Sequence, residues 1–329
     1  MRGDSMADKM NICLINDSFP PIIDGVANAV LNYASIIEKE YGTATVATPY
    51  YPNADDSVYP YKVVRFPSID TTKLVGYRAG FPFSAEVLEE IRSQNIDLIH
   101  THCPITSTFL ARTLRDTLDA PVVLTYHTKF DIDIANAIRG KLLQKGAIKA
   151  LVENISACDE VWAVSRGAGE NLRSIGYTGE YTVMENGVDI PKGRVPDEAI
   201  AKAMAGFDLP QGVPVFLFVG RMVWYKGLRC ILEAMAELSA KGRDFRMVFI
   251  GGGTDKDGAE EFAKQLGIEN KCFFTGPIYD RDTIRAWYCR GDLFLFPSEF
   301  DTNGLVVREA AACGLGSMLI EGSCAAEGI

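Results

Sequence analysis

The segment 293–314 limits what this chain can fold into more than any other stretch. An apolar run at residues 293–296 breaks at Pro297 into a polar loop, and Gly304 opens an alanine-rich segment that Gly314 closes. Proline and glycine mark such boundaries where a strand gives way to a loop and where a helix ends. The segment therefore predicts a strand–loop–helix unit of an α/β fold, in which ligands collect at the ends of the strands.

A helix that begins at Gly304 presents unpaired N–H groups and the positive end of its dipole, and phosphate is the anion that such an end favours. Glu309 follows about 7 Å further along the axis, with its side chain leaning back towards the start of the helix. Asp301 lies in the loop before it. Both carboxylates can accept hydrogen bonds from a sugar attached to the phosphate. The alternative is that Asp301 caps the helix and Glu309 is solvated.

The same alternation of apolar runs and helical patterns recurs along the chain. Its composition shifts to Pro, Lys, Gly and Arg around residues 191–196, which is typical of a linker. We therefore predict two Rossmann-like domains, residues 1–192 and 193–329. Strands are expected at residues 11–15, 43–47, 62–66, 97–100, 121–126, 160–164, 181–184, 215–219, 246–250, 272–275 and 292–296, and helices at 27–38, 85–94, 105–117, 304–314 and from 228.

Charge and cysteine usage limit the class of protein. The net charge is −10, from 33 basic and 43 acidic residues, so nucleic acid is not the expected partner. No apolar run approaches the length of a membrane span, and residues 1–10 are too polar for a signal peptide. Eight scattered cysteines without a C-x-x-C pair indicate reduced thiols and a cytoplasmic location.

The first predicted domain offers two candidate ligand contacts. Gly25 stands at a loop-to-helix junction, where its backbone can approach a ligand closely, although it can also simply start the helix. His127 follows the strand at 121–126 and projects into the crevice, or is satisfied by local backbone. His100 and His102 share a strand face, but no second Cys/His pair stands at ligand spacing, which disfavours a metal site; they remain candidates for lining a cleft.

One helical stretch of the first domain concentrates positive charge in an acidic chain. It carries Arg139, Lys141, Lys145 and Lys149 among apolar residues. This pattern permits a peripheral contact with an anionic membrane or the steering of a charged acceptor. A solvated helix face is the favoured interpretation.

The second predicted domain carries a pair of cations on one strand-to-helix loop. The continuous apolar run at 215–219 is typical of a strand covered on both faces, and Arg221 and Lys226 follow it. An arginine fork and a mobile lysine charge together outline a diphosphate clamp, the alternative being ordinary surface cations. The glycines at 251–253 lack the rest of a dinucleotide fingerprint, which disfavours a nicotinamide dehydrogenase.

As a set, these features resemble the retaining glycosyltransferases of family 4, which have the GT-B architecture of two Rossmann-like domains facing across a cleft. The set comprises His127, Arg221 and Lys226 five apart, the motif at 185–189, and Asp301 followed eight residues later by Glu309. The resemblance covers residues 11–329. It implies a cytoplasmic hexosyltransferase that uses a UDP- or GDP-sugar, acts on a lipid or glycan hydroxyl, and needs neither a metal nor a cofactor.

The resemblance also implies roles for single residues. Arg221 and Lys226 hold the diphosphate, and His127 contacts the sugar near the reacting centre. The resemblance places the backbone of Leu305 and Val306 at the donor phosphates, with Gly25 beside them. It places Glu309 at the ribose, and Gly276 and Ile278 at the base. Three residues of the loop before the helix face the hexose: Asp301, Asn303 and Gly304.

Two departures from the family pattern stand out. Asp301 replaces the usual Glu, which shortens the carboxylate by one methylene, and the chain stops at Ile329, where the family continues with a further strand and a crossing helix. We therefore expect a truncated second domain. The competing readings are a GT-B-type epimerase, which alters a nucleotide sugar without an acceptor, and a non-catalytic protein that binds sugar nucleotides.

Overall fold

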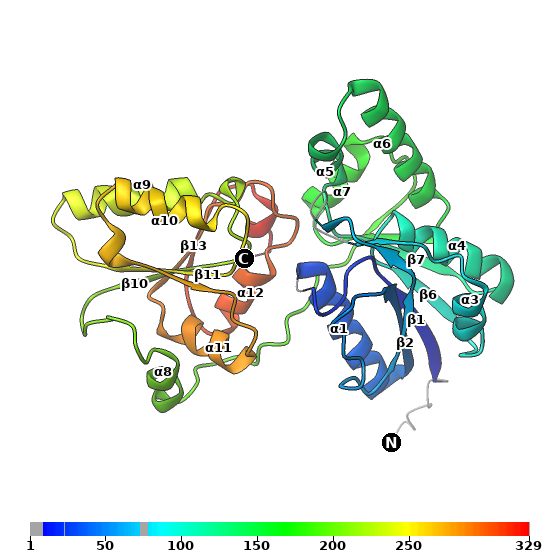
Figure 1. The fold of residues 1–329 in the computed structure, drawn as a ribbon, viewed down its shortest axis with the longest axis horizontal. Helices are drawn as coiled ribbons and strands as arrows, with labels where there is room; N and C mark the ends of the chain where they lie inside the picture. Colours follow the sequence, from blue (N-terminus) through cyan, green and yellow to red (C-terminus); the bar gives the residue numbers. More distant parts are fainter. Residues whose placement is uncertain (1–8, 23, 73–77, 329) are drawn as a thin grey trace, which may run out of the picture. The chain divides into compact units, whose positions relative to one another are not determined.

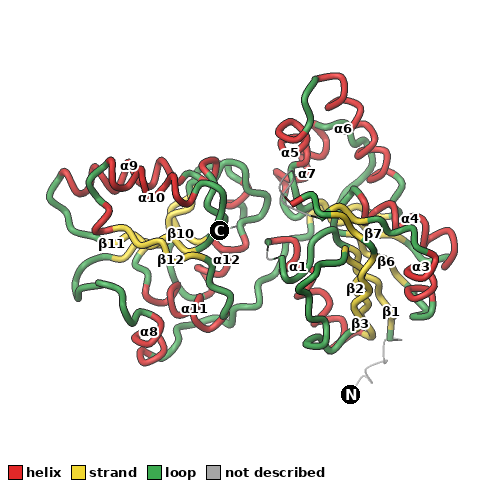
Figure 2. Tube along the Cα trace, viewed as in Figure 1, coloured by secondary structure: helices red, strands yellow, loops and turns green. Residues whose placement is uncertain are grey.

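A computed structural model describes residues 9–22, 24–72 and 78–328. The chain divides into two compact units, Met1–Gly187 (unit 1) and Val188–Ile329 (unit 2), and each is described by itself. Each unit is built on a parallel β-sheet with helices on both faces, as Figures 1 and 2 show. The prediction of an α/β protein with two Rossmann-like halves is confirmed.

Unit 1 has a seven-stranded sheet with the order β3-β2-β1-β6-β7-β8-β9. Its strands are β1 (Met10–Ile15), β2 (Gly42–Pro49), β3 (Lys62–Phe66), β6 (Leu98–Thr101), β7 (Val122–Tyr126), β8 (Glu160–Ala163) and β9 (Thr182–Val183). A short antiparallel pair, β4 (Ser68–Ile69) and β5 (Ala79–Gly80), lies outside this sheet. The helices are α1 (Gly25–Ile36), a π-helix (Ile37–Tyr41), α3 (Ala85–Arg92), α4 (Thr106–Leu118), α5 (Phe130–Ala137), α6 (Lys141–Ser156) and α7 (Arg166–Ser174).

Side chains of β1 show how the sheet of unit 1 is covered. Cys13 and Ile15 belong to the buried cluster that includes residues of α3 and α4, whereas Ile12 and Leu14 belong to the cluster that includes residues of α1. Successive side chains of a strand point to opposite faces, so both faces are buried. The carboxyl ends of the strands therefore remain as the edge at which polar side chains can meet a ligand.

Unit 2 has a five-stranded parallel sheet with the order β12-β11-β10-β13-β14. Its strands are β10 (Val215–Val219), β11 (Arg246–Ile250), β12 (Cys272–Gly276), β13 (Leu293–Phe296) and β14 (Ser317–Leu319). The helices are α8 (Asp197–Ala203), α9 (Leu228–Ala240), α10 (Lys256–Gln265), α11 (Arg281–Arg290) and α12 (Leu305–Ala312), with short 3₁₀ turns at Trp224–Lys226, Glu269–Lys271 and Cys324–Ala326.

The start of unit 2 is attached firmly to its own core. Ile190 is buried in the core of unit 2, and Gly193 N donates a hydrogen bond of 2.8 Å to the carbonyl oxygen of Ala312. These contacts make the segment from Val188 onward part of unit 2. The predicted domain boundary at 192/193 lies a few residues further along.

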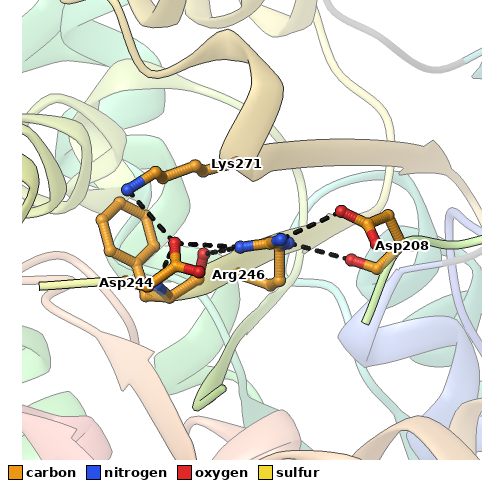
Figure 3. Close-up of polar contacts among 5 residues, drawn as sticks. Asp208, Asp244, Arg246 and Lys271 are labelled. Atoms are coloured by element: carbon orange, nitrogen blue, oxygen red, sulfur yellow. Dashed lines mark hydrogen bonds and ion pairs between the residues drawn. The ribbon is translucent and has the colours of Figure 1, made fainter. Parts of the chain in front are cut away.

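A charged network fixes the amino-terminal end of β11 (Figure 3). The buried Arg246 guanidinium donates to the side chain and the carbonyl of Asp208, both at 2.9 Å, and to Asp244 at 3.1 Å. Lys271 pairs with Asp244 at 3.2 Å. Several hydrogen bonds compensate the desolvated guanidinium. The network lies at the opposite end of β11 from the strand ends that carry the candidate site, so its role is to hold the scaffold.

Two further observations concern the cysteines and the lengths of the helices. Five of the eight free cysteines are buried and one, Cys230, is exposed. Within the described ranges, we find no helix that combines the length and the apolar character needed to cross a membrane.

Candidate functional site

The loops after β10 and β13 lie against each other at the carboxyl edge of the unit 2 sheet. Gly227 adopts φ +83°, and a Cβ atom there would lie 2.4 Å from the carbonyl oxygen of Pro297. Only glycine permits both this conformation and this approach. The close contact brings Lys226, the residue before Gly227, to the loop that carries Asp301.

Lys226 and Asp301 form a largely buried ion pair. Lys226 Nζ lies 2.5 Å from Asp301 Oδ2, and the side chains are 18% and 15% exposed. Burial by itself raises the pKa of the Asp301 carboxyl, but the charge and hydrogen bond of Lys226 and the N–H groups of Gly304 and Thr302 hold it below its ordinary value. Asp301 is therefore ionised at neutral pH, and it offsets the charge that Lys226 offers to an anion.

Arg221, the other predicted cation, contacts the exposed side chain of Tyr225. Its Nη2 donates to the Tyr225 hydroxyl, and the guanidinium lies 5.9 Å from the centroid of that ring. The Tyr225 ring packs edge-on against Phe300 at 6.2 Å. Arg221 is thus exposed and supported by Tyr225, whereas Lys226 is largely buried beside its carboxylate partner.

The N-terminus of α12 is shaped by Gly304. This residue adopts φ +64°, and a Cβ there would lie 2.9 Å from the Cβ of Ala325. The helix begins at Leu305, so Leu305 and Val306 lie in its first turn. These are the positions predicted to face phosphate, because the first N–H groups of a helix have no partner within it. Asn303, directly before the helix, is buried.

Glu309 is fixed by two neighbours that were absent from the predicted site. Arg281 Nη2 donates to its Oε1 at 2.8 Å, and the Tyr288 hydroxyl donates to its Oε2 at 2.9 Å. Arg281 also pairs with Asp189. Burial and the nearby carboxylate raise the pKa of the Tyr288 phenol well above its ordinary value, so Tyr288 stays a donor. Glu309 is 7% exposed, and each carboxylate oxygen retains a lone pair for a ligand hydroxyl.

The sequence contained a signal for these two neighbours. Arg281 and Tyr288 are seven residues apart in α11, which is two helical turns, so they share one face. The sequence does not show, however, that this face of α11 is turned towards α12, because that depends on how the two helices pack on the sheet.

The predicted base-binding segment follows β12. Gly276 ends that strand with φ +75°, and its carbonyl oxygen accepts from Gly251 N at 3.0 Å. Ile278 is half-buried against the core of unit 2. Its side chain is therefore a fixed apolar surface near the end of β12.

Gly25 and His127 belong to unit 1. Gly25 is the first residue of α1, whose N-cap, Asp24, accepts from Val26 N at 2.9 Å and from Ala27 N at 2.7 Å. His127 follows β7 and is 5% exposed, and burial lowers its pKa to about 3, so its ring is neutral at physiological pH. In the part of the chain that the structure describes, no three His, Cys, Asp or Glu side chains are grouped so as to hold a metal ion.

Within unit 2, the structure thus brings together Lys226, Asp301 and the start of α12, and it anchors Glu309 inside that helix. Their roles towards a ligand remain predictions.

Comparisons with known proteins identify the family. A family model described as Glycosyltransferase Family 4 matches residues 23–192, and one described as Glycosyl transferases group 1 matches residues 200–319.

Relatives cover most of the chain. The chain is 24% identical over 312 residues to an alpha-monoglucosyldiacylglycerol synthase of Streptococcus pneumoniae, covering 93% of this chain and 70% of that protein. It is 25% identical to a GDP-mannose-dependent alpha-mannosyltransferase of Corynebacterium glutamicum, covering 93% and 71%. For a D-inositol 3-phosphate glycosyltransferase of Xylanimonas cellulosilytica, the identity is 28% and the coverage 76% and 61%.

Solved structures share the fold. Anabaena HepE in complex with UDP and glucose superposes with a TM-score of 0.74 at 18% identity, covering 96% of this chain and 82% of that one. Sucrose-phosphate synthase of Thermosynechococcus elongatus gives 0.74 at 20% identity, covering 94% and 81%. Because the first family model alone spans more than half of the chain, this protein belongs to glycosyltransferase family 4 and has the GT-B fold.

Proposed function

We propose that this glycosyltransferase moves a hexose from a UDP- or GDP-sugar to an acceptor hydroxyl, with retention at the anomeric carbon. The observation that supports this most is the grouping of Lys226, Asp301 and the start of α12 at one sheet edge. A fixed cation and a helix N-terminus are the groups that stabilise the charge of a leaving diphosphate.

In the proposed reaction, the acceptor oxygen bonds to the anomeric carbon on the face that the phosphate leaves. The bond from that carbon to the phosphate oxygen breaks, and both of its electrons go to the phosphate. The acceptor proton passes to an oxygen of the leaving phosphate, so neither a protein base nor a metal is required. Lys226, Arg221 and the N–H groups of Leu305 and Val306 act on the charge that develops at the diphosphate.

The remaining candidates bind the donor. Glu309, oriented by Arg281 and Tyr288, accepts hydrogen bonds from the ribose hydroxyls. The base rests against Gly276 and Ile278, and Asp301, Asn303 and Gly304 face the hexose. Gly25 and His127 contribute from unit 1, at the phosphates and at the sugar. Because Asp301 is already committed to Lys226, donor preference depends on how the hexose shares this carboxylate.

The acceptor proposed here is a lipid or a glycan at the cytoplasmic face of a membrane, and α6 is the surface that meets the membrane. Leu142 and Leu143 are 84% and 66% exposed, beside the exposed Lys141 and Lys145. Apolar side chains flanked by lysines suit an anionic interface. A relative named for a diacylglycerol product agrees with such an acceptor.

The membrane contact is tested by co-sedimentation with phosphatidylglycerol vesicles and with phosphatidylcholine vesicles. We expect binding to the anionic vesicles only, and its loss in a Leu142→Ser/Leu143→Ser variant. Val58, 66% exposed elsewhere in unit 1, supplies the control Val58→Ser. Equal binding by both variants would refute the assignment of α6.

The reaction itself is tested with a panel of nucleotide sugars. Thermal shift selects the donor, because a ligand at about 100 times its Kd adds about 2.7 kcal/mol of stability. The selected donor is then incubated with acceptor, and NMR determines the anomeric configuration of the product. We expect the configuration of the donor. Inversion would refute the mechanism, and a changed donor sugar without any acceptor would indicate an epimerase.

A further inference from the structure

The three histidines of this chain form one buried cluster in unit 1. His100 lies in β6, His102 just after it, and His127 just after the neighbouring strand β7. They are 4%, 1% and 5% exposed. The rings of His100 and His102 lie 4.1 Å apart, and those of His102 and His127 are stacked at 5.2 Å. The ring of His102 is therefore enclosed by the other two and cannot rotate freely.

One hydrogen bond links His102 to His127. His102 Nδ1 and His127 Nε2 lie 2.9 Å apart. The other nitrogen of His127, Nδ1, meets the side-chain amide of Asn186, which donates from Nδ2 at 3.4 Å. His100 does not take part in this series of hydrogen bonds, because its Nε2 is bonded to the Thr125 hydroxyl at 2.7 Å. The contact with Asn186 is the longest of the three, so a ligand hydroxyl can displace it most easily.

The single proton between His102 and His127 couples their tautomers. Burial keeps both rings neutral, because it lowers the pKa of each imidazole. If His127 Nε2 carries the proton, His102 Nδ1 accepts, and His102 then has its own proton on Nε2. If His102 Nδ1 carries the proton, His127 must have its own on Nδ1. The two rings therefore always have the same tautomer. Among the described residues, His102 Nε2 has no hydrogen-bond partner that could set the tautomer independently.

We propose that His102 is a positioning residue for transfer: it holds the ring of His127 by the Nδ1–Nε2 hydrogen bond, so that His127 offers only its Nδ1 edge to the donor sugar. This inference rests on the proposed function, in which His127 contacts the sugar. With Asn186 donating to His127 Nδ1, that nitrogen is an acceptor and both rings have the Nε2–H form. A sugar hydroxyl that replaces Asn186 then donates to a nitrogen whose orientation is already fixed, which favours a productive geometry.

The first test is spectroscopic and needs no substrate. In protein labelled with ¹⁵N-histidine, every histidine signal comes from this cluster, because the chain has three histidines. Long-range ¹H–¹⁵N spectra distinguish the two neutral tautomers. We expect His102 and His127 in the same tautomer. Different tautomers in these two rings would overturn the proposal, whatever the enzyme transfers.

The second test separates positioning from packing. His102→Leu keeps the side-chain bulk but removes the hydrogen bond, whereas His102→Asn places an amide atom where Nδ1 stood. We expect kcat to fall about tenfold in His102→Leu, with the KM for the donor within about twofold, and to recover in His102→Asn. Val58→Ser, at an exposed position of unit 1 outside the cluster, is the control with unchanged kcat. Equal losses in the Leu and Asn variants would overturn the proposal.

The two tests also separate this inference from the proposed function. If no nucleotide sugar is turned over but His102 and His127 have the same tautomer in the wild-type protein, the function fails and the coupling stands. If transfer proceeds normally in His102→Leu, the positioning role fails and the function stands.

Discussion

Acidification should destabilise unit 1 through its buried histidines. The pKa of His100 and of His127 is lowered from 6.5 to about 3 by burial, so the folded protein leaves both rings neutral where the unfolded chain protonates them. Their favourable contribution is therefore complete above pH 6.5 and is lost progressively as the pH falls towards 3. At about 1.4 kcal/mol per pH unit below 6.5, each ring costs about 2 kcal/mol at pH 5.

The assay is urea unfolding at pH 7 and pH 5, followed through the histidine NMR signals, which all report on unit 1. A His100→Asn variant removes one titrating ring while other pH-dependent groups, including the buried Asp17 whose pKa is raised by desolvation, remain. We expect the loss of unfolding free energy between pH 7 and pH 5 to be about 2 kcal/mol smaller in the variant. Histidine signals that titrate near pH 6.5 in the folded protein, or an equal loss in both proteins, would refute this reasoning.

Three further substitutions test the site and its scaffold. Asp301→Asn removes the carboxylate that offsets Lys226, so UDP or GDP should bind about fivefold more tightly, about 1 kcal/mol, while transfer falls; calorimetry showing weaker nucleotide binding would contradict this. Tyr288→Phe withdraws one hydrogen bond from the buried Glu309 and should lower the unfolding free energy of unit 2 by about 1–3 kcal/mol, and an unchanged urea midpoint would show that the bond is not stabilising. Arg246→Met should cost about 1–3 kcal/mol of stability without changing the KM for the donor, because its network lies at the far end of β11; a raised KM would mean that this network reaches the site.

Local signals in the sequence were sufficient for the main elements. Pro297, Gly304 and Gly314 predicted the strand, loop and helix that appear as β13 and α12, because these residues restrict the backbone wherever they stand. The apolar run at 215–219 likewise predicted β10. Helix α8, by contrast, was not predicted: it begins directly after the segment 191–196 that was interpreted as a linker, and its acidic first turn is a weaker signal.

The partners within the site could not be predicted in the same way. Lys226 and Asp301 are 75 residues apart, and only the packing of two loops brings them together. The same holds for Arg281 and Glu309, and for the coupling of His102 with His127. Residue types and motif spacing indicated which side chains carry chemistry. Which groups neutralise, orient or protonate them depends on tertiary contacts that no local pattern encodes.

The central claim is tested most directly by release of the nucleoside diphosphate. Wild-type protein and Lys226→Ala are incubated with the donor chosen by thermal shift, with and without lipid or glycan acceptors, and released UDP or GDP is measured while circular dichroism confirms that both are folded. We predict release that depends on an acceptor in the wild type and is abolished in Lys226→Ala, because the leaving diphosphate then lacks its fixed cation. Undiminished release by a folded Lys226→Ala variant would contradict the account.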